Sequence, residues 1–170
     1  MRTIGATRFI DSGWNLYFIT DPEGQPAEPV DIVAPPNGLA GLMAPSYVTV
    51  RTGTHYGPIR ITIEAHDHAP ELDLNGWTDI VELPFRVVGY VAFATDGGQA
   101  FYRADVTPGA WRLRVSARGR DAGAAGSWEP FDPEEGPEQA PAEEHLLQLF
   151  PGVGDEVVYK AEDDFGKRGR

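Results

Sequence analysis

Glycine and proline recur so often along this 170-residue chain that long helices have no place to form. The two residue types number 20 and 15, and the longest stretches that contain neither are 11 residues long, at 59–69 and 155–165. Proline breaks a helix interior and glycine weakens it, so helices of three or more turns are not expected. The spacing instead predicts short strands that are joined by turns.

Period-two alternation in the intervening segments supports strands. The clearest case is 111–121, where Trp111, Leu113 and Val115 fall on one face of the strand and arginines fall on the other. Strands are expected at 14–20, 47–51, 59–66, 81–87, 90–94, 101–106, 111–121 and 144–150. The sequence therefore predicts an all-β protein, an antiparallel β-sandwich or jelly roll of about seven to nine strands with little helix.

The polar face of segment 111–121 carries a strip of arginines, and the register places them outward. Such a strip is stabilised by carboxylates on neighbouring strands or by solvent, or it binds a phosphate or carboxylate ligand. Arg118 and Arg120 lie nearest the following loop and are candidate contacts for a partner. The strip consists of Arg112, Arg114, Arg118 and Arg120.

The overall charge limits the classes of partner. A net charge of −12 and a pI of about 4.6 argue against direct binding to nucleic acid or to an anionic membrane, and they favour a basic protein. The absence of cysteine excludes disulfides, thiolate zinc sites and thiol catalysis. The N-terminus lacks an apolar signal core, and no apolar run approaches the roughly 20 residues of a membrane span, so a cytoplasmic location is predicted.

Composition divides the chain into one β-domain at 1–160 and a flexible charged tail at 161–170. Within the domain, 121–143 is rich in Gly, Ala, Pro and Glu and predicts a mobile acidic loop. Seven carboxylates and no Lys or Arg lie between 129 and 144, so the loop is a candidate docking segment for a basic partner. The candidate contacts are Glu134, Glu135, Glu138, Glu143 and Glu144, with Asp163 and Asp164 of the tail as secondary candidates.

A His-x-His pair at a strand end offers an alternative, a metal site. His66 and His68 point the same way on a strand, and Glu64 or Glu71 is placed to add a carboxylate, as in a cupin-like enzyme or sensor. The spacing departs from the cupin pattern, Pro70 interrupts the strand, and no second histidine motif follows. A polar surface turn is therefore the preferred interpretation, and no cofactor is predicted.

Other catalytic signatures do not occur in the sequence. There is no G-x-S-x-G nucleophile elbow and no glycine-rich phosphate loop that leads from a strand into a helix, so no reaction is indicated. A carbohydrate-binding module is a further alternative that rests on aromatic side chains. Most of these, including Trp14, are expected in the core, and Trp77 and Trp128 lie in loops.

The order of segments resembles the competence protein J family of small nuclease inhibitors. The segments that carry the resemblance are SGWNLYF, GLAGLMAPSYVTV, VELPFRVVGYVAF and RADVTPGAWRLRV, within residues 8–115. The acidic loop and the strand HLLQLF are an elaboration beyond that pattern. The resemblance implies an inhibitor with no catalytic residues, and an acidic protein can imitate the polyanion that a nuclease binds.

The leading hypothesis is therefore an acidic protein-binding module of the inhibitor or immunity type that acts on a basic toxin or nuclease. The metal-binding enzyme or sensor and the carbohydrate-binding module remain the alternatives.

Overall fold

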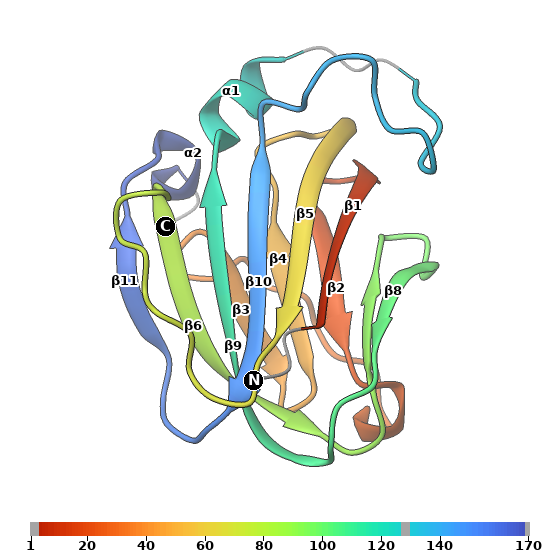
Figure 1. Ribbon diagram of the computed structural model, residues 1–170, viewed down its shortest axis with the longest axis vertical. Coiled ribbons are helices and arrows are strands. Elements are labelled where there is room, and N and C mark those ends of the chain that lie inside the picture. The colour runs from red at the N-terminus through yellow and green to blue at the C-terminus, as the bar shows by residue number, and fades with distance from the viewer. Residues whose placement is uncertain (1–3, 127–129, 169–170) are drawn as a thin grey trace.

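Two β-sheets pack face to face in the computed structural model, which describes residues 4–126 and 130–168 (Figure 1). The six-stranded sheet has the order β1-β5-β10-β9-β6-β11, and the five-stranded sheet has the order β3-β4-β2-β7-β8. The first sheet contains β1 (Ile4–Ser12), β5 (Gly57–Ala65), β10 (Glu144–Pro151), β9 (Gly109–Arg118), β6 (Asp79–Val87) and β11 (Val157–Ala161). The second contains β3 (Ala40–Ala44), β4 (Tyr47–Arg51), β2 (Leu16–Thr20), β7 (Val91–Ala94) and β8 (Ala100–Ala104). The predicted all-β sandwich is confirmed.

The core lies between the sheets and follows the predicted alternation. Leu113 and Val115 of β9 are fully buried in it, next to Leu83 of β6 and Leu147 of β10. The register expected for this strand is therefore confirmed. Tyr17 and Phe93 complete the core from the five-stranded sheet.

Eleven strands occur in the described residues, more than the seven to nine expected. Three of them, β1, β3 and β11, were not anticipated. All pairings are antiparallel except that of β10 with β5. The parallel pair arises because β10 inserts between β5 and β9 after the long connection that follows β9.

The helices are short, as the glycine and proline spacing predicts. They are the 3₁₀-helix η1 (Pro22–Gly24), α1 (Arg120–Ala125) and α2 (Asp164–Lys167). Among the described residues, no helix is long and apolar enough to cross a membrane. Within the segment predicted to be a flexible tail, Ala161 ends β11, Asp164–Lys167 form α2, and Asp163 is buried. The expectations for 127–129 and 169–170 lie outside the described residues.

The outer face of the six-stranded sheet is partly covered, so two of its arginines are buried. Segment 66–78 crosses this face in front of β9 and β10 (Figure 1). The Arg114 guanidinium donates to the carbonyls of Pro70 and Glu71, at 3.1 and 3.3 Å. Arg114 is only 5% exposed, so it is not solvated. Its place on the outer face is as expected, and it pairs with the Glu82 carboxylate of the neighbouring strand β6, which is the first of the expected alternatives.

Arg112, the first arginine of the strip, also donates to backbone carbonyls. Its side chain donates to the carbonyls of Gly154 and Asp155, at 2.7 and 2.8 Å, and fixes the connection between β10 and β11. Glu82 of β6 lies between Arg112 and Arg114 and pairs with both, at 2.9 and 3.2 Å. Arg112 and Arg114 are therefore paired within the fold.

Candidate functional site

The acidic loop after α1 is built around a compact turn. Asp132 forms an isolated bridge with Gly136, whose N–H donates to the Asp132 carbonyl at 2.7 Å. The Asp132 carboxylate accepts from the Glu134 N–H at 2.8 Å. Gly136 has a φ of +81°, and a Cβ there would lie 3.1 Å from the Phe9 ring, so glycine suits both the turn and the packing. Residues 132–136 of the acidic loop therefore form a hydrogen-bonded turn.

Glu143 anchors the far end of this loop inside the protein. One carboxylate oxygen accepts from the Gly53 N–H at 3.0 Å, and the other accepts from the Thr54 N–H and hydroxyl at 2.7 Å each. Burial alone would raise the pKa of Glu143, but hydrogen bonds from His145 and Thr54 outweigh it and lower that pKa. Glu143 is fully buried, which corrects the expectation that it faces a partner.

A hydrogen-bonded chain continues from Glu143 across the core. The carboxylate only accepts, so His145 donates to it from Nε2 at 2.8 Å, and the Tyr17 hydroxyl donates to His145 Nδ1 at 2.8 Å. Burial, reinforced by the Glu143 charge, holds the pKa of Tyr17 well above its usual range. All three side chains are at most 1% exposed, so the chain joins the two sheets and is closed to a substrate.

A second buried charge cluster fixes α1 to α2. Arg120 is fully buried and donates to both carboxylate oxygens of Asp163, at 2.6 and 2.9 Å, and to the Gly38 carbonyl at 2.7 Å. Asp79 of β6 lies 3.4 Å from the same guanidinium. Arg120 and Asp163 were expected to be surface contacts. The structure uses both internally, because the guanidinium satisfies the carboxylate and a carbonyl at once.

The two carboxylates of this cluster interact with each other. Burial and a hydrogen bond to Asp163 raise the pKa of Asp79 to about 6. Asp163 is also buried, but the hydrogen bond to Asp79 and the charge of Arg120 lower its pKa. Two carboxyls that share one cation divide their protons in this way, one holding the proton and the other the charge.

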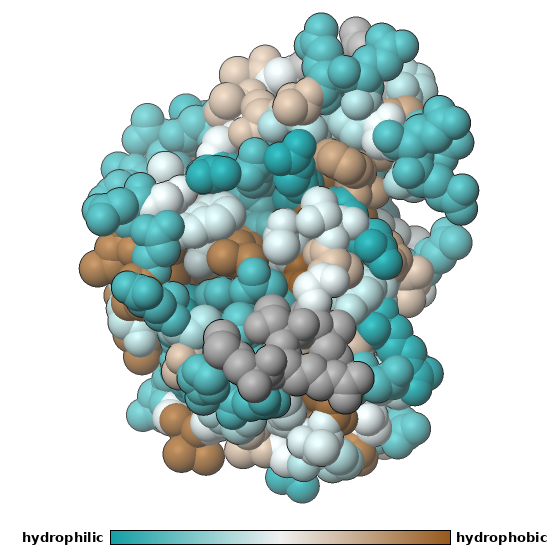
Figure 2. All heavy atoms as spheres, in the orientation of Figure 1, coloured by the Kyte–Doolittle hydropathy of each residue, from teal (hydrophilic) through white to brown (hydrophobic). Residues whose placement is uncertain are grey.

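Outside these clusters, the acidic loop borders an open cleft of about 810 Å³. Asp132, Glu135 and Glu138 line it from the loop, and Tyr56 lines it from the segment before β5. No Lys or Arg is among its described lining residues. Hydrophilic side chains dominate the loop at the upper right of Figure 2. The cleft is therefore a concave surface of negative charge.

The remaining predicted contacts do not line this cleft. Glu134 is exposed on the same turn as Glu135. Glu144 is half-buried and pairs with Arg118 at 2.7 Å and with Arg60 at 3.6 Å. Arg118 also stacks over the Trp77 ring at 4.8 Å. Arg118 and Glu144 thus neutralise each other locally and are poorer partner contacts than the loop glutamates.

A strained aromatic turn adjoins the cleft. Trp14 and Asn15 form the two-residue turn between β1 and β2 with φ of +57° and +60°, a conformation that favours glycine and asparagine. Trp14 is 66% exposed, which corrects its expected place in the core, and its ring lies edge-on to His55 and Tyr56. The Asn15 amide donates to the Thr52 and Gly53 carbonyls, so this turn and Glu143 share one anchor segment.

Sequence reasoning missed this aromatic turn and the role of Asp132. A signal for Asp132 is present, because DPEEG has aspartate and proline at the first two positions of a β-turn and a glycine directly after the turn. Trp14 has no comparable local signal. A tryptophan in a strand-rich segment usually packs inward, and its exposure depends on the tight turn.

Two solved structures share this arrangement of sheets. One, titled crocagin biosynthetic gene J, aligns with a TM-score of 0.63 and 11% identity, over 90% of this chain and 100% of the other. The other is ComJ from Bacillus subtilis, described as an inhibitor of the DNA degrading activity of NucA. It aligns with a TM-score of 0.62 and 10% identity, over 89% of this chain and 100% of ComJ. The chain has a ComJ-like fold. No family model and no curated protein matches its sequence.

The ComJ-like fold does not bring the two histidines of the metal hypothesis together with further ligands. His66 is buried and its Nε2 pairs with the Glu64 carboxylate at 2.7 Å, whereas His68 is exposed. Among the described residues, no group of three or more His, Asp or Glu side chains is placed to hold a metal ion. The geometry therefore favours the acidic cleft as the candidate site.

Proposed function

We propose that this ComJ-like protein is an inhibitor-type binding module that docks a basic protein on its acidic cleft. The observation that carries the proposal is the concentration of Asp132, Glu135 and Glu138 in one cleft with no described Lys or Arg beside them. Carboxylates on a concave surface attract a cationic partner at long range and raise its association rate. The similarity to ComJ supports a nuclease as the partner.

The exposed Trp14 turn supplies the second element of such an interface. Charged rims mainly speed the encounter, whereas buried aromatic side chains slow dissociation. Trp14 lies beside Tyr56, which lines the cleft, so one partner surface can reach both. We therefore assign long-range attraction to the loop carboxylates and the lasting contact to Trp14.

The test measures binding to the protein encoded by the neighbouring gene, by surface capture at two salt concentrations. If that protein cuts DNA, a DNA-degradation assay measures its inhibition as well. Replacing Glu134, Glu135 and Glu138 with Gln is expected to lower the association rate about tenfold at low salt and to weaken its salt dependence. The matched control removes three exposed charges that lie outside the acidic loop, by Glu28→Gln, Asp31→Asn and Glu71→Gln. Equal effects of the two triple variants would contradict the assignment of the cleft.

Trp14→Ala is tested in the same assay. It is expected to raise the dissociation rate at least tenfold with little change in association rate, because an aromatic anchor acts after encounter. Tyr159→Ala, on the exposed edge strand β11, is the aromatic control. A dissociation rate that Trp14→Ala leaves unchanged would place the lasting contact elsewhere.

A further inference from the structure

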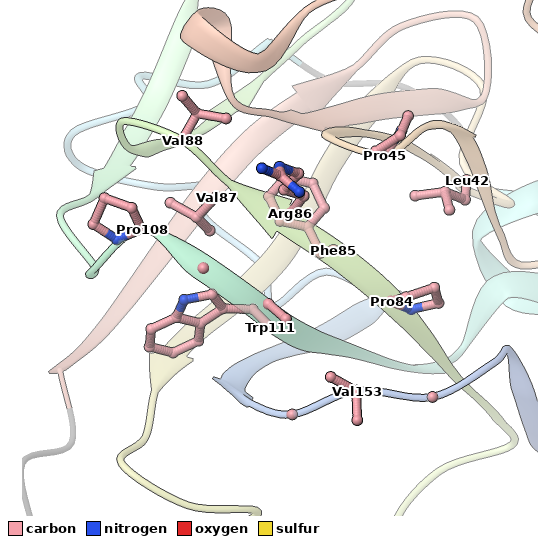
Figure 3. A pocket seen from close by; sticks show the side chains of 14 residues that line it. Leu42, Pro45, Pro84, Phe85, Arg86, Val87, Val88, Pro108, Trp111 and Val153 are labelled. Atoms are coloured by element: carbon pink, nitrogen blue, oxygen red, sulfur yellow. The ribbon is translucent and has the colours of Figure 1, made fainter.

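A second hollow, of about 640 Å³, lies at the opposite end of the sandwich. β9 connects the two ends, since it starts at Gly109 beside this pocket and ends at Arg118 near the acidic cleft, roughly 30 Å away along the strand. Apolar side chains from β3, β6, β9 and the β10–β11 connection form its walls (Figure 3). They are Leu42, Pro45, Pro84, Phe85, Val87, Val88, Pro108, Trp111 and Val153.

The pocket is open because β11 covers only half of β6. β11 pairs with residues 79–82 of β6, while β6 continues to Val87. Pro84 has no N–H to offer a further strand, and the Arg86 N–H and carbonyl are already bonded to Pro45 and Ser46, at 2.8 and 2.7 Å. An added β-strand therefore finds no ladder here, and the pocket presents side chains instead.

Arg86 is the single charged residue among the pocket's lining residues. Its side chain is exposed and makes no ion pair or hydrogen bond with the described residues, unlike Arg112, Arg114 and Arg120. Figure 3 shows Arg86 between Pro45 and Val88 on one side and Trp111 and Val153 on the other. A guanidinium that has no partner among the described residues and lies beside apolar walls, in a chain of net charge −12, is able to bind an anion.

We propose that this pocket binds a small amphipathic carboxylate, with its hydrocarbon body against Trp111 and Val87 and its carboxylate on Arg86. The volume lies in the range of sites for small ligands, which combine apolar walls with a few placed polar groups. The planar fork of arginine matches a carboxylate. One cation in an acidic protein favours a single negative charge over a polyanion, which the rest of the chain repels.

Decanoate below its micelle concentration is the probe, and decanol, of the same chain length without the charge, is the comparison ligand. Calorimetry is expected to show one decanoate site per chain, with the indole N–H resonance of Trp111 shifting on binding. Arg86→Gln is expected to weaken decanoate binding about tenfold and to leave decanol binding within twofold. Val153→Glu, which places a like charge on the wall, is expected to weaken decanoate binding as well.

Arg8→Gln is the matched control, since it removes one exposed cation from β1 at the far edge of the same sheet. It is expected to leave both ligands unaffected. The proposal is overturned if decanoate shows no saturable site, if Arg86→Gln weakens both ligands equally, or if Arg8→Gln matches the effect of Arg86→Gln. Because the pocket shares no lining residue with the acidic cleft, this result is independent of the proposed partner.

Discussion

The two ends of the sandwich carry hollows of similar size and opposite character. At the acidic end, the cleft walls carry three carboxylates, and the elements around them are fixed by the buried groups Glu143 and Arg120. At the apolar end, hydrocarbon forms the walls and the one charged group, Arg86, is exposed and unpaired with the described residues. The same residue types therefore have different roles at the two ends.

This difference separates charge that holds the fold from charge that is available to a ligand. A buried ion that has lost its water must find partners within the protein, and removing one partner leaves the others uncompensated. An exposed ion keeps its hydration and contributes little to stability. The two ends thus offer matched pairs of residues on which to test the distinction.

The largest effect is expected for the two arginines. Arg120→Met should lower the free energy of unfolding by about 3–5 kcal/mol, because it leaves Asp79 and Asp163 buried beside each other without a cation. Arg86→Met should leave it unchanged within error. Urea unfolding measures the free energy of unfolding of both variants. Arg120→Lys keeps the charge but loses the two-point contact with Asp163, so its free energy of unfolding should lie between those of the two Met variants. Equal stabilities of Arg120→Met and Arg86→Met would remove the contrast between the two ends.

A smaller effect is expected for two glutamates of the same loop. Glu143 accepts four hydrogen bonds on its two oxygens, and a glutamine there would turn an NH₂ group toward two buried donors. Glu143→Gln should therefore destabilise the protein by about 2 kcal/mol. Glu138→Gln, at the cleft surface, should leave stability unchanged. If Glu143→Gln left the free energy of unfolding unchanged, the anchoring of the loop would not depend on the charge of Glu143.

The smallest effect concerns pH. The pKa of Asp79 is raised to about 6, so the folded state binds its proton more tightly than the unfolded state does. Its contribution to stability is complete below about pH 4 and is lost as the pH rises through about 6. In Asp79→Asn, an amide replaces the protonated carboxyl and does not titrate. The decrease in the free energy of unfolding between pH 5 and 7 should therefore be about 1 kcal/mol smaller in this variant. Thermal unfolding of both proteins at four pH values measures this difference. An identical pH profile in Asp79→Asn would contradict the assignment of a shared proton to Asp79.

Local pattern predicted most strands but missed three, and for two of them, β3 and β11, the reason is identifiable. The segment AGLMA of β3 contains small residues and no alternation, and it becomes a strand because β4 pairs with it. β11 is an edge strand whose residues are half-buried at most, so its sequence carries no signal of an inward face. β11 depends on β6, which is distant in the sequence and outside the reach of local pattern, whereas β3 forms a hairpin with the adjacent strand β4.

The sequence by itself determined the class of structure, through glycine and proline spacing that excludes long helices, and the inward face of β9, through strict alternation. It also determined the acidic balance. Only the tertiary structure decided that Glu143 is buried while Glu138 is exposed, and that Arg120 is paired while Arg86 has no partner among the described residues. The partners of Glu143 at Gly53 and Thr54 are 90 and 89 residues away, and Asp163 lies 43 residues from Arg120. Periodicity is a property of neighbouring residues, whereas burial and charge pairing depend on which distant segments the fold brings together.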